Sequence, residues 1–331
     1  MKNSIRHFMA ATLFAVCTGA GLISCSDSGA GKPTSTSSSG IATIACDASF
    51  ENILSQEIDV FEYIYPQASI IPYYVDESAA FDSLLNFSTK MIIATRPLND
   101  KELSYLKSHD KIVRQSQIAV DALALIVNPE NPIEQMSKQE LREILTGKVT
   151  RWDEVSPSKL GEISVVFDHQ GSSAAHYMRD SLLNGGKFAS NVYAQKTHQA
   201  VFDAVAKNKN AIGIIGVSWI SSDMTERTRT REEMVKAVEE NENVENTFSS
   251  AVKVLPVSAD DEVRAYKPYQ AYIFEGKYPL YRQVYMITAA AGGTLTHGFY
   301  TFVTSYRGQK IIQLTGVLPR VVQLATAAQV N

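Results

Sequence analysis

The stretch DALALIVNPENP, residues Asp121–Pro132, is the part of the sequence that decides the fold. Its apolar run begins at Ala119 and continues to Val127, and Asn128-Pro129 ends it, because a proline disfavours helix in the residue before it and has no amide hydrogen to donate. The length and composition of the run predict an extended, buried strand.

Strand and helix patterns alternate on both sides of this run. On its C-terminal side, Ser137 and Glu140 form a capping box that opens a helix, and Gly147 ends that helix. The alternation predicts an α/β protein of two lobes, each a mainly parallel sheet flanked by helices. We expect residues 41–125 plus 281–331 in lobe 1 and residues 126–280 in lobe 2. The expected strands are 41–46, 69–74, 91–94, 119–127, 163–167, 211–215 and 281–288.

The N-terminus carries the features of an export signal. Lys2 and Arg6 precede the apolar run Phe8–Leu22, which is too short for a membrane-spanning helix of about 20 residues. The run ends in LISC, which resembles a bacterial lipobox, so we expect a signal peptide over 1–24 and a lipid on Cys25. An ordinary signal peptide with Cys25 as a bystander is the alternative. Residues 25–40 are rich in Ser, Thr and Gly and are expected to form a flexible tether.

Composition and motifs exclude several function classes. The chain of 331 residues has 31 basic and 35 acidic residues, a net charge of −4, which does not suit a nucleic-acid binder. Neither a phosphate-binding P-loop nor an H-E-x-x-H zinc motif is present. We therefore expect a protein that is not an enzyme and that needs no metal or cofactor. An exported hydrolase with a serine near a cleft stays open as an alternative.

Three short polar loops each connect a strand to a helix. They contain Asp47-Ala48-Ser49, Asp76-Glu77-Ser78 and Gln170-Gly171-Ser172-Ser173. The first amides of a helix have no partner inside it, and the helix dipole favours negative charge there. Several such loops together would bind a small anion, whereas the simpler interpretation is that each serine only caps its own helix.

Several segments resemble the solute-binding component of phosphate-type ABC importers, in the type II periplasmic binding protein superfamily. They are residues 94–98, 121–132, 137–152, 211–216 (AIGIIG) and 308–312. This resemblance implies two lobes that close by a hinge over an oxyanion such as inorganic phosphate, and an ABC permease and ATPase as partners. It also implies a monomer on the periplasmic side of the cell envelope, held to the membrane through its lipid alone. A solute sensor or scaffold on the same fold, without import, is a further alternative.

The resemblance also implies which residues touch the ligand. Ser49 and Phe50 match the family's first loop, and Ser78 falls near the serine of the second loop. Gly171, Ser172 and Ser173 fall at the third loop.

Two charges depart from the family pattern. Thr95 and Arg96 occupy the segment where family members have Ser-Asp, whose carboxylate accepts a proton from hydrogen phosphate, and Asp168 stands where they have an arginine. We therefore expect Arg96 to supply the cation and Asp168 the acceptor, paired across the closed cleft. The alternative is that Arg96 anchors the turn Thr95–Leu98 and that Asp168 is a solvated cap.

Overall fold

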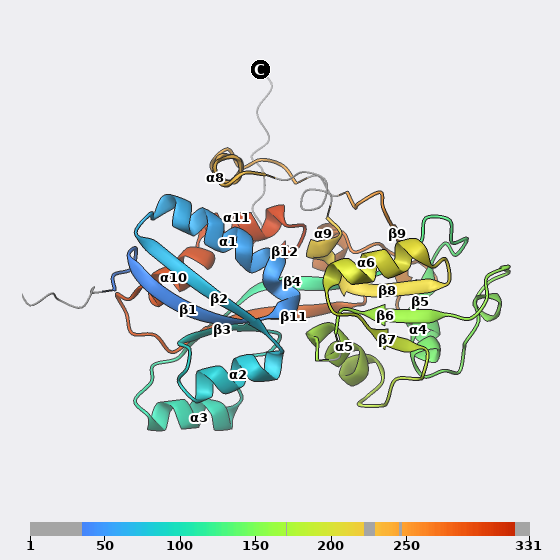
Figure 1. Cartoon of the computed structure of the whole chain (residues 1–331), viewed down its shortest axis with the longest axis horizontal. Coiled ribbons are helices and arrows are strands. Elements are labelled where there is room, and N and C mark those ends of the chain that lie inside the picture. Colours follow the sequence, from blue (N-terminus) through green and yellow to red (C-terminus); the bar gives the residue numbers. More distant parts are fainter. Residues whose placement is uncertain (1–34, 170, 222–228, 245–246, 322–331) are drawn as a thin grey trace, which may run out of the picture. The chain divides into compact units, whose positions relative to one another are not determined.

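One large sheet organises the chain (Figure 1). The computed structural model describes residues 35–169, 171–221, 229–244 and 247–321. The strands lie in the order β2-β1-β3-β11-β4-β8-β6-β7, with β9 and β12 also paired to β4, and β5 and β10 form a separate pair. The strands are β1 Gly40–Asp47, β2 Ala68–Val75, β3 Met91–Ala94, β4 Arg114–Val127, β5 Met136–Ser137, β6 Ser164–Phe167, β7 Val192–Ala194, β8 Ala211–Gly216, β9 Lys253–Leu255, β10 Val257–Ser258, β11 Tyr281–Thr288 and β12 Leu318–Pro319.

Helices cover this sheet, as the alternating pattern predicted. The predicted capping box at Ser137 with Glu140 is confirmed, and Asn99 with Glu102 forms a second one at the start of the helix Asp100–Ser108. The helices are α1 Glu51–Ile64, α2 Glu77–Leu85, α3 Asp100–Ser108, α4 Lys138–Leu145, α5 Ser173–Tyr177, α6 His198–Lys207, α8 Arg231–Glu239, α9 Gln270–Phe274, α10 Leu295–Val303 and α11 Tyr306–Leu314, with short turns η1 Ala48–Phe50, η2 Trp152–Glu154, η3 Met178–Leu182 and η4 Val217–Trp219.

Strand β4 joins two groups of parallel strands. One group is β2-β1-β3 and the other is β8-β6-β7, and within each the pairing is parallel. The first part of β4 runs antiparallel to β11, and its last part, Leu123–Val127, runs antiparallel to β8. The α/β fold class is therefore as predicted, with the long apolar strand linking the two groups. The exact limits of the two lobes stay a prediction.

The predicted tether needs a correction at its C-terminal end. Residues 35–40 are part of the folded body, since Gly40 already begins β1 and Thr36 forms a bridge with Ser39. The hydroxyl of Ser35 accepts a hydrogen bond of 2.9 Å from the amide of Leu295, which satisfies one of the free amides at the start of α10. The folded body thus begins no later than Ser35, because these small polar residues pack against a helix end.

The remaining N-terminal predictions concern residues that the structure does not describe. The signal peptide, Cys25 and residues 25–34 all lie outside the described residues. Within the described ranges, no helix combines the length and the apolar character needed to cross a membrane. Cys46 is a free cysteine that is buried in the core.

Candidate anion-binding site

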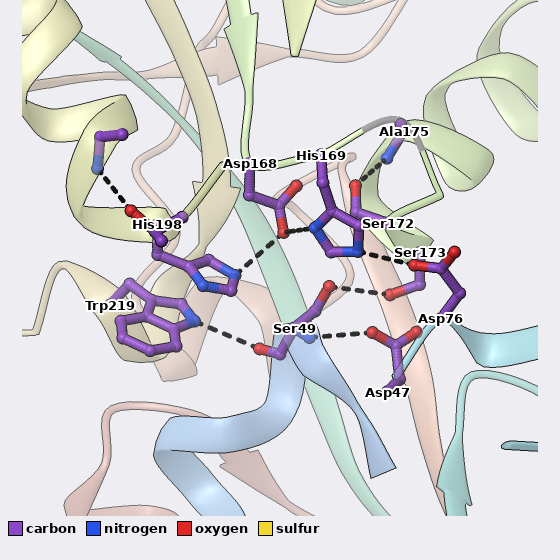
Figure 2. A network of polar contacts seen from close by, with 12 residues as sticks. Asp47, Ser49, Asp76, Asp168, His169, Ser172, Ser173, Ala175, His198 and Trp219 are labelled. Carbon is purple, nitrogen blue, oxygen red and sulfur yellow. Dashed lines mark hydrogen bonds and ion pairs between the residues drawn. The ribbon is translucent and has the colours of Figure 1, made fainter. Parts of the chain in front are cut away.

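The first and the third predicted loops meet in the structure. Ser49 follows β1 at the start of the first helical turn, and Ser173 is the first residue of α5. The hydroxyl of Ser173 donates a hydrogen bond of 3.1 Å to the hydroxyl of Ser49, and both side chains are buried (Figure 2). Segments far apart in the sequence therefore bring two hydroxyls and two helix starts to one place.

A buried arginine from a third segment completes this contact. Arg282 lies on β11 and is only 4% exposed. Its Nη1 donates to the hydroxyl of Ser173, while its Nε and Nη2 donate to one carboxylate oxygen of Asp121 at 3.0 and 2.9 Å. The guanidinium carbon lies 4.7 Å from the centre of the Phe50 ring, a distance at which the cation and the aromatic ring attract. A fixed positive charge thus lies beside the serine pair.

A buried carboxylate, Asp47, lies at the same position. One of its oxygens accepts the amide of Ser49 at 2.9 Å, and the other accepts no hydrogen bond within the part of the chain that the structure describes. Burial raises the pKa of Asp47, and the positive charge of Arg282 opposes that rise. The cluster therefore holds an acceptor as well as donors.

A second network surrounds Asp168, directly after β6. Its Oδ2 lies 3.2 Å from Nδ1 of His169 and 3.0 Å from Nε2 of His198 (Figure 2). Burial alone would raise the pKa of Asp168, but the contacts with the two histidines outweigh burial and hold the pKa well below the ordinary value. The ring of His198 stacks on Trp219 at 4.0 Å, and the indole nitrogen of Trp219 donates to the backbone oxygen of Ser49 at 3.2 Å. Asp168 therefore connects the loop before α5, through His169, with the start of α6, through His198.

A cavity of about 410 Å³ opens beside Ser173 and Arg282. It is large enough for a small oxyanion with some water. Its wall carries two arginines and one histidine, together with two carboxylates. The lining residues are Glu77, Thr95, Arg96, Ser173, His176, Tyr177, Asp180, Ser181, Arg282 and Gln283.

The structure gathers most of the predicted site residues but not all of them. Ser49, Phe50, Gly171, Ser172 and Ser173 lie around the meeting point of the loops. The hydroxyl of Ser172 accepts the amide of Ala175 at 3.1 Å and so caps α5, as the simpler interpretation of these serines expected.

The second predicted loop is arranged differently. Ser78 is exposed on the first turn of α2 and does not line the cavity, whereas its neighbour Glu77 does. Thr95 lines the cavity, and both its amide and its hydroxyl donate to one oxygen of Glu77, at 2.5 and 2.6 Å.

The expected pairing of Arg96 with Asp168 is wrong. Arg96 donates to both carboxylate oxygens of Glu102 at 2.9 Å, and its guanidinium lies 3.6 Å above the ring of Phe81. Asp168 is instead buried between two histidines. The reason is local, because the capping box at the start of α3 already places Glu102 within reach of Arg96. Arg96 nevertheless lines the cavity.

Sequence reasoning missed Arg282 and Asp121, although a signal was present. Along β11 the buried positions alternate, and Arg282 is in phase with Val284 and Met286, which face the core. A charged residue at an inward position of a strand needs a partner. Asp121 is likewise the one charged residue in the apolar run 119–127. Two opposite charges at inward positions of two strands would have predicted the ion pair between Arg282 and Asp121.

Comparisons with known proteins define the family. Residues 31–307 match the family described as the PBP superfamily domain, and the chain belongs to that family. Among solved structures, the chain is similar to an ABC transporter substrate-binding protein with bound phosphate from Clostridium perfringens, with a TM-score of 0.65 and 20% identity over 85% of this chain and 99% of that one. It is also similar to an ABC-type phosphate transport receptor from Vibrio cholerae, with a TM-score of 0.61 and 17% identity over 85% of this chain and 100% of that one.

The chain is also similar to curated proteins. The chain is 23% identical to the phosphate-binding protein PstS of Staphylococcus saprophyticus over 67% of this chain and 62% of that protein. It is 25% identical to the protein of the same name from a bovine strain of Staphylococcus aureus, over 49% of this chain and 50% of that protein. The chain thus spans between half and two thirds of the length of these relatives.

Proposed function

We propose that this protein is a solute-binding protein that captures phosphate, or a similar small oxyanion, for an ABC importer. The observation that carries the proposal is the buried guanidinium of Arg282, which contacts Ser173 at the wall of a cavity of about 410 Å³. A fixed cation, hydroxyls and helix starts in one place can replace the hydration shell of a small anion. The names of its relatives, which bind phosphate, support the same ligand.

Each group in the site would have a distinct role. Arg282 and the hydroxyls of Ser49 and Ser173 would donate to the anion from the buried side, with Phe50 holding the guanidinium in place. Arg96, at the cavity wall, would add positive charge that attracts the anion during its approach. The remaining predicted ligand positions, Ser78, Thr95, Asp168, Gly171 and Ser172, would orient the loops or reach the anion when the lobes close.

Asp47 would determine which anion is accepted. Its free oxygen is buried, so a fully ionised anion such as sulfate would bring two lone pairs together without a proton between them. Monohydrogen phosphate carries a proton that can be donated to a carboxylate. We therefore expect the site to prefer phosphate over sulfate.

The location and partners of the protein follow from the same proposal. A lipid on Cys25 would anchor the chain, as a monomer, to a membrane of the cell envelope on its periplasmic side. An ABC permease and its ATPase would receive the anion, and the protein itself would perform no catalysis. Mass spectrometry of the mature protein from its native membrane should find a diacylglyceryl group on Cys25, and an unmodified Cys25 would contradict the anchor.

Isothermal titration calorimetry of the full-length chain tests the ligand. Phosphate should bind with a dissociation constant of about 1 μM or tighter, and sulfate at least about 100-fold more weakly. An Arg151→Lys variant is a matched control, because Arg151 is exposed and pairs only with Asp153 in the described structure. Equal binding of the two anions would contradict the role of Asp47, and an absence of phosphate binding would contradict the proposed function. Hydrolysis of a phosphoester that disappears in Ser172→Ala would instead support the exported hydrolase.

A further inference from the structure

Both ring nitrogens of His169 face carboxylates. Nδ1 lies 3.2 Å from an oxygen of Asp168, and Nε2 lies 3.0 Å from an oxygen of Asp76 (Figure 2). A neutral imidazole carries a hydrogen on only one nitrogen, so its other nitrogen would direct a lone pair at a carboxylate. Only the protonated ring can donate to both partners at once.

The two carboxylates belong to different groups of parallel strands. Asp76 follows β2 and is the N-cap residue of α2, whereas Asp168 follows β6. The side chain of Asp168 is 3% exposed, that of His169 is 27% exposed and that of Asp76 is 49% exposed. His169 is therefore held firmly on the Asp168 side, while its contact with Asp76 remains open to solvent and to protons.

Gly171 marks the same contact between segments. A Cβ atom at this position would lie 2.3 Å from an oxygen of Asp76, far inside the distance that two such atoms can reach. The backbone at Gly171 and the Asp76 carboxylate can approach this closely only because glycine has no side chain. A side chain at this position would displace the Asp76 carboxylate from its place beside His169.

Further titratable and charged groups of both signs surround His169. Asp47 adds negative charge, and His198 shares the Asp168 carboxylate from its far side. Arg179 and Tyr193 line a neighbouring cavity of about 380 Å³ together with His169. The hydrogen bond that His169 donates to Asp168 is the largest influence and raises the pKa of His169, with Asp76 and Asp47 acting in the same direction and partial burial opposing them.

We propose that His169 is a proton-dependent latch between Asp76 and Asp168, which favours the closed site when the ring is protonated and favours opening when it is neutral. This inference rests on the proposed function, because closure matters only if the site retains an anion. The latch responds to protonation of His169. Raising the pH would open the site and release the bound anion.

The direction of the pH dependence follows from the linkage between protonation of His169 and closure of the site. When the site opens, His169 loses its contact with Asp76 but keeps its contact with Asp168, so its pKa falls only by the part that Asp76 supplies. Closure is therefore favoured below the pKa of the open state, and the advantage is lost as the pH rises through the higher pKa of the closed state. A difference of about one pKa unit between the two states changes the closure equilibrium by about tenfold.

The distance between the two segments can be measured without any anion. Dyes would be placed on cysteines introduced at the exposed positions Lys107 and Lys159, in the full-length chain with Cys17 and Cys25 changed to serine. Cys46 is buried and would not be labelled. Single-molecule energy transfer in a phosphate-free buffer should report a closed fraction that falls roughly threefold or more between about pH 5.5 and about pH 8.5.

Variants separate the latch from general effects on structure. His169→Gln should remove the pH dependence, and Asp76→Asn should reduce it, while Gly171→Ala should lower the closed fraction at every pH. His109→Gln is the matched control, because His109 is exposed directly after α3 and contacts Tyr105, Ser108 and Phe87, none of which belongs to the latch. An unchanged pH dependence in His169→Gln would overturn the latch.

The result can be distinguished from failure of the proposed function. The measurement without anion tests the latch alone, and addition of phosphate at each pH tests the site. Phosphate that closes the protein equally at every pH, in the natural chain and in His169→Gln, would overturn the latch and leave the proposed function intact. A pH-dependent distance that phosphate and sulfate both leave unchanged would support the latch and contradict phosphate capture.

Discussion

Arg282 and Asp121 stand directly opposite each other on the antiparallel strands β11 and β4, with 2.9 Å between Nη2 and the carboxylate. Their side chains are 3% and 1% exposed. Burial raises the pKa of Asp121, and the arginine opposes that rise. The pair lies where β4 turns from its partner β11 toward β8, so the strands that join the two parallel groups also fix the cation of the site.

Arg282→Lys should weaken phosphate binding by at least about tenfold, because an ammonium cannot donate to Asp121 and to Ser173 in the planar fork of a guanidinium. Calorimetry measures this directly. Arg96→Ala is the comparison, and it should weaken binding by less than about threefold at physiological salt, since Glu102 already neutralises Arg96. A larger effect at Arg96 than at Arg282 would reverse the roles proposed for the two arginines.

Arg282→Met should lower the free energy of unfolding by roughly 3–5 kcal/mol, because it leaves the carboxylate of Asp121 buried without its cation. The double variant Arg282→Met with Asp121→Leu should recover most of that loss, since it removes both charges. Urea unfolding of Arg282→Met, Asp121→Leu, the double variant and the natural chain gives the coupling energy between the two residues. A double variant that is less stable than Arg282→Met would contradict the conclusion that the loss of stability comes from breaking the Arg282–Asp121 ion pair.

Ser172→Ala and Ser173→Ala should separate capping from ligand binding. Ser172 caps α5, so its loss should cost about 1 kcal/mol of stability. Ser173 lies between Arg282 and Ser49, so its loss should weaken phosphate binding by about tenfold with a smaller change in the melting temperature. Calorimetry and thermal unfolding of both variants check the assignment, and the opposite pattern would exchange the two roles.

Asp168→Asn should destabilise the protein at neutral pH and should do so less in acid. The histidines hold the pKa of Asp168 below its unfolded value, so the ionised group contributes stability above a pH of about 4, and this contribution is lost as the pH falls through the folded value. The difference between the natural chain and the variant should be on the order of 2 kcal/mol at pH 7 and should shrink below about pH 4. Urea unfolding at the two values measures it, and a constant difference would contradict the linkage.

Local patterns in the sequence predicted much of the fold. The apolar run 119–127, the capping box at Ser137 and the strand 91–94 all appear as expected, because each depends on neighbours within a few residues. The loop that contains Ser49 and the loop that contains Ser173 were also predicted as helix starts.

Partners across the chain could not be predicted in the same way. Arg96 was expected to face Asp168, but a glutamate six positions away in the chain reaches it first. Which of several charged groups pair depends on the packing of whole strands and on how much water remains around each group.

By itself, the sequence predicted the alternation of the longer strands with helices, and that polar loops precede three of the helices, because backbone geometry and capping are local. Only the tertiary structure decided that Arg282 supplies the buried cation, that Ser49 and Ser173 touch, and that His169 lies between Asp76 and Asp168. These contacts arise because β4 and β11 bring distant segments together, and a charge that loses its water must then bond to whichever partner the sheet places beside it.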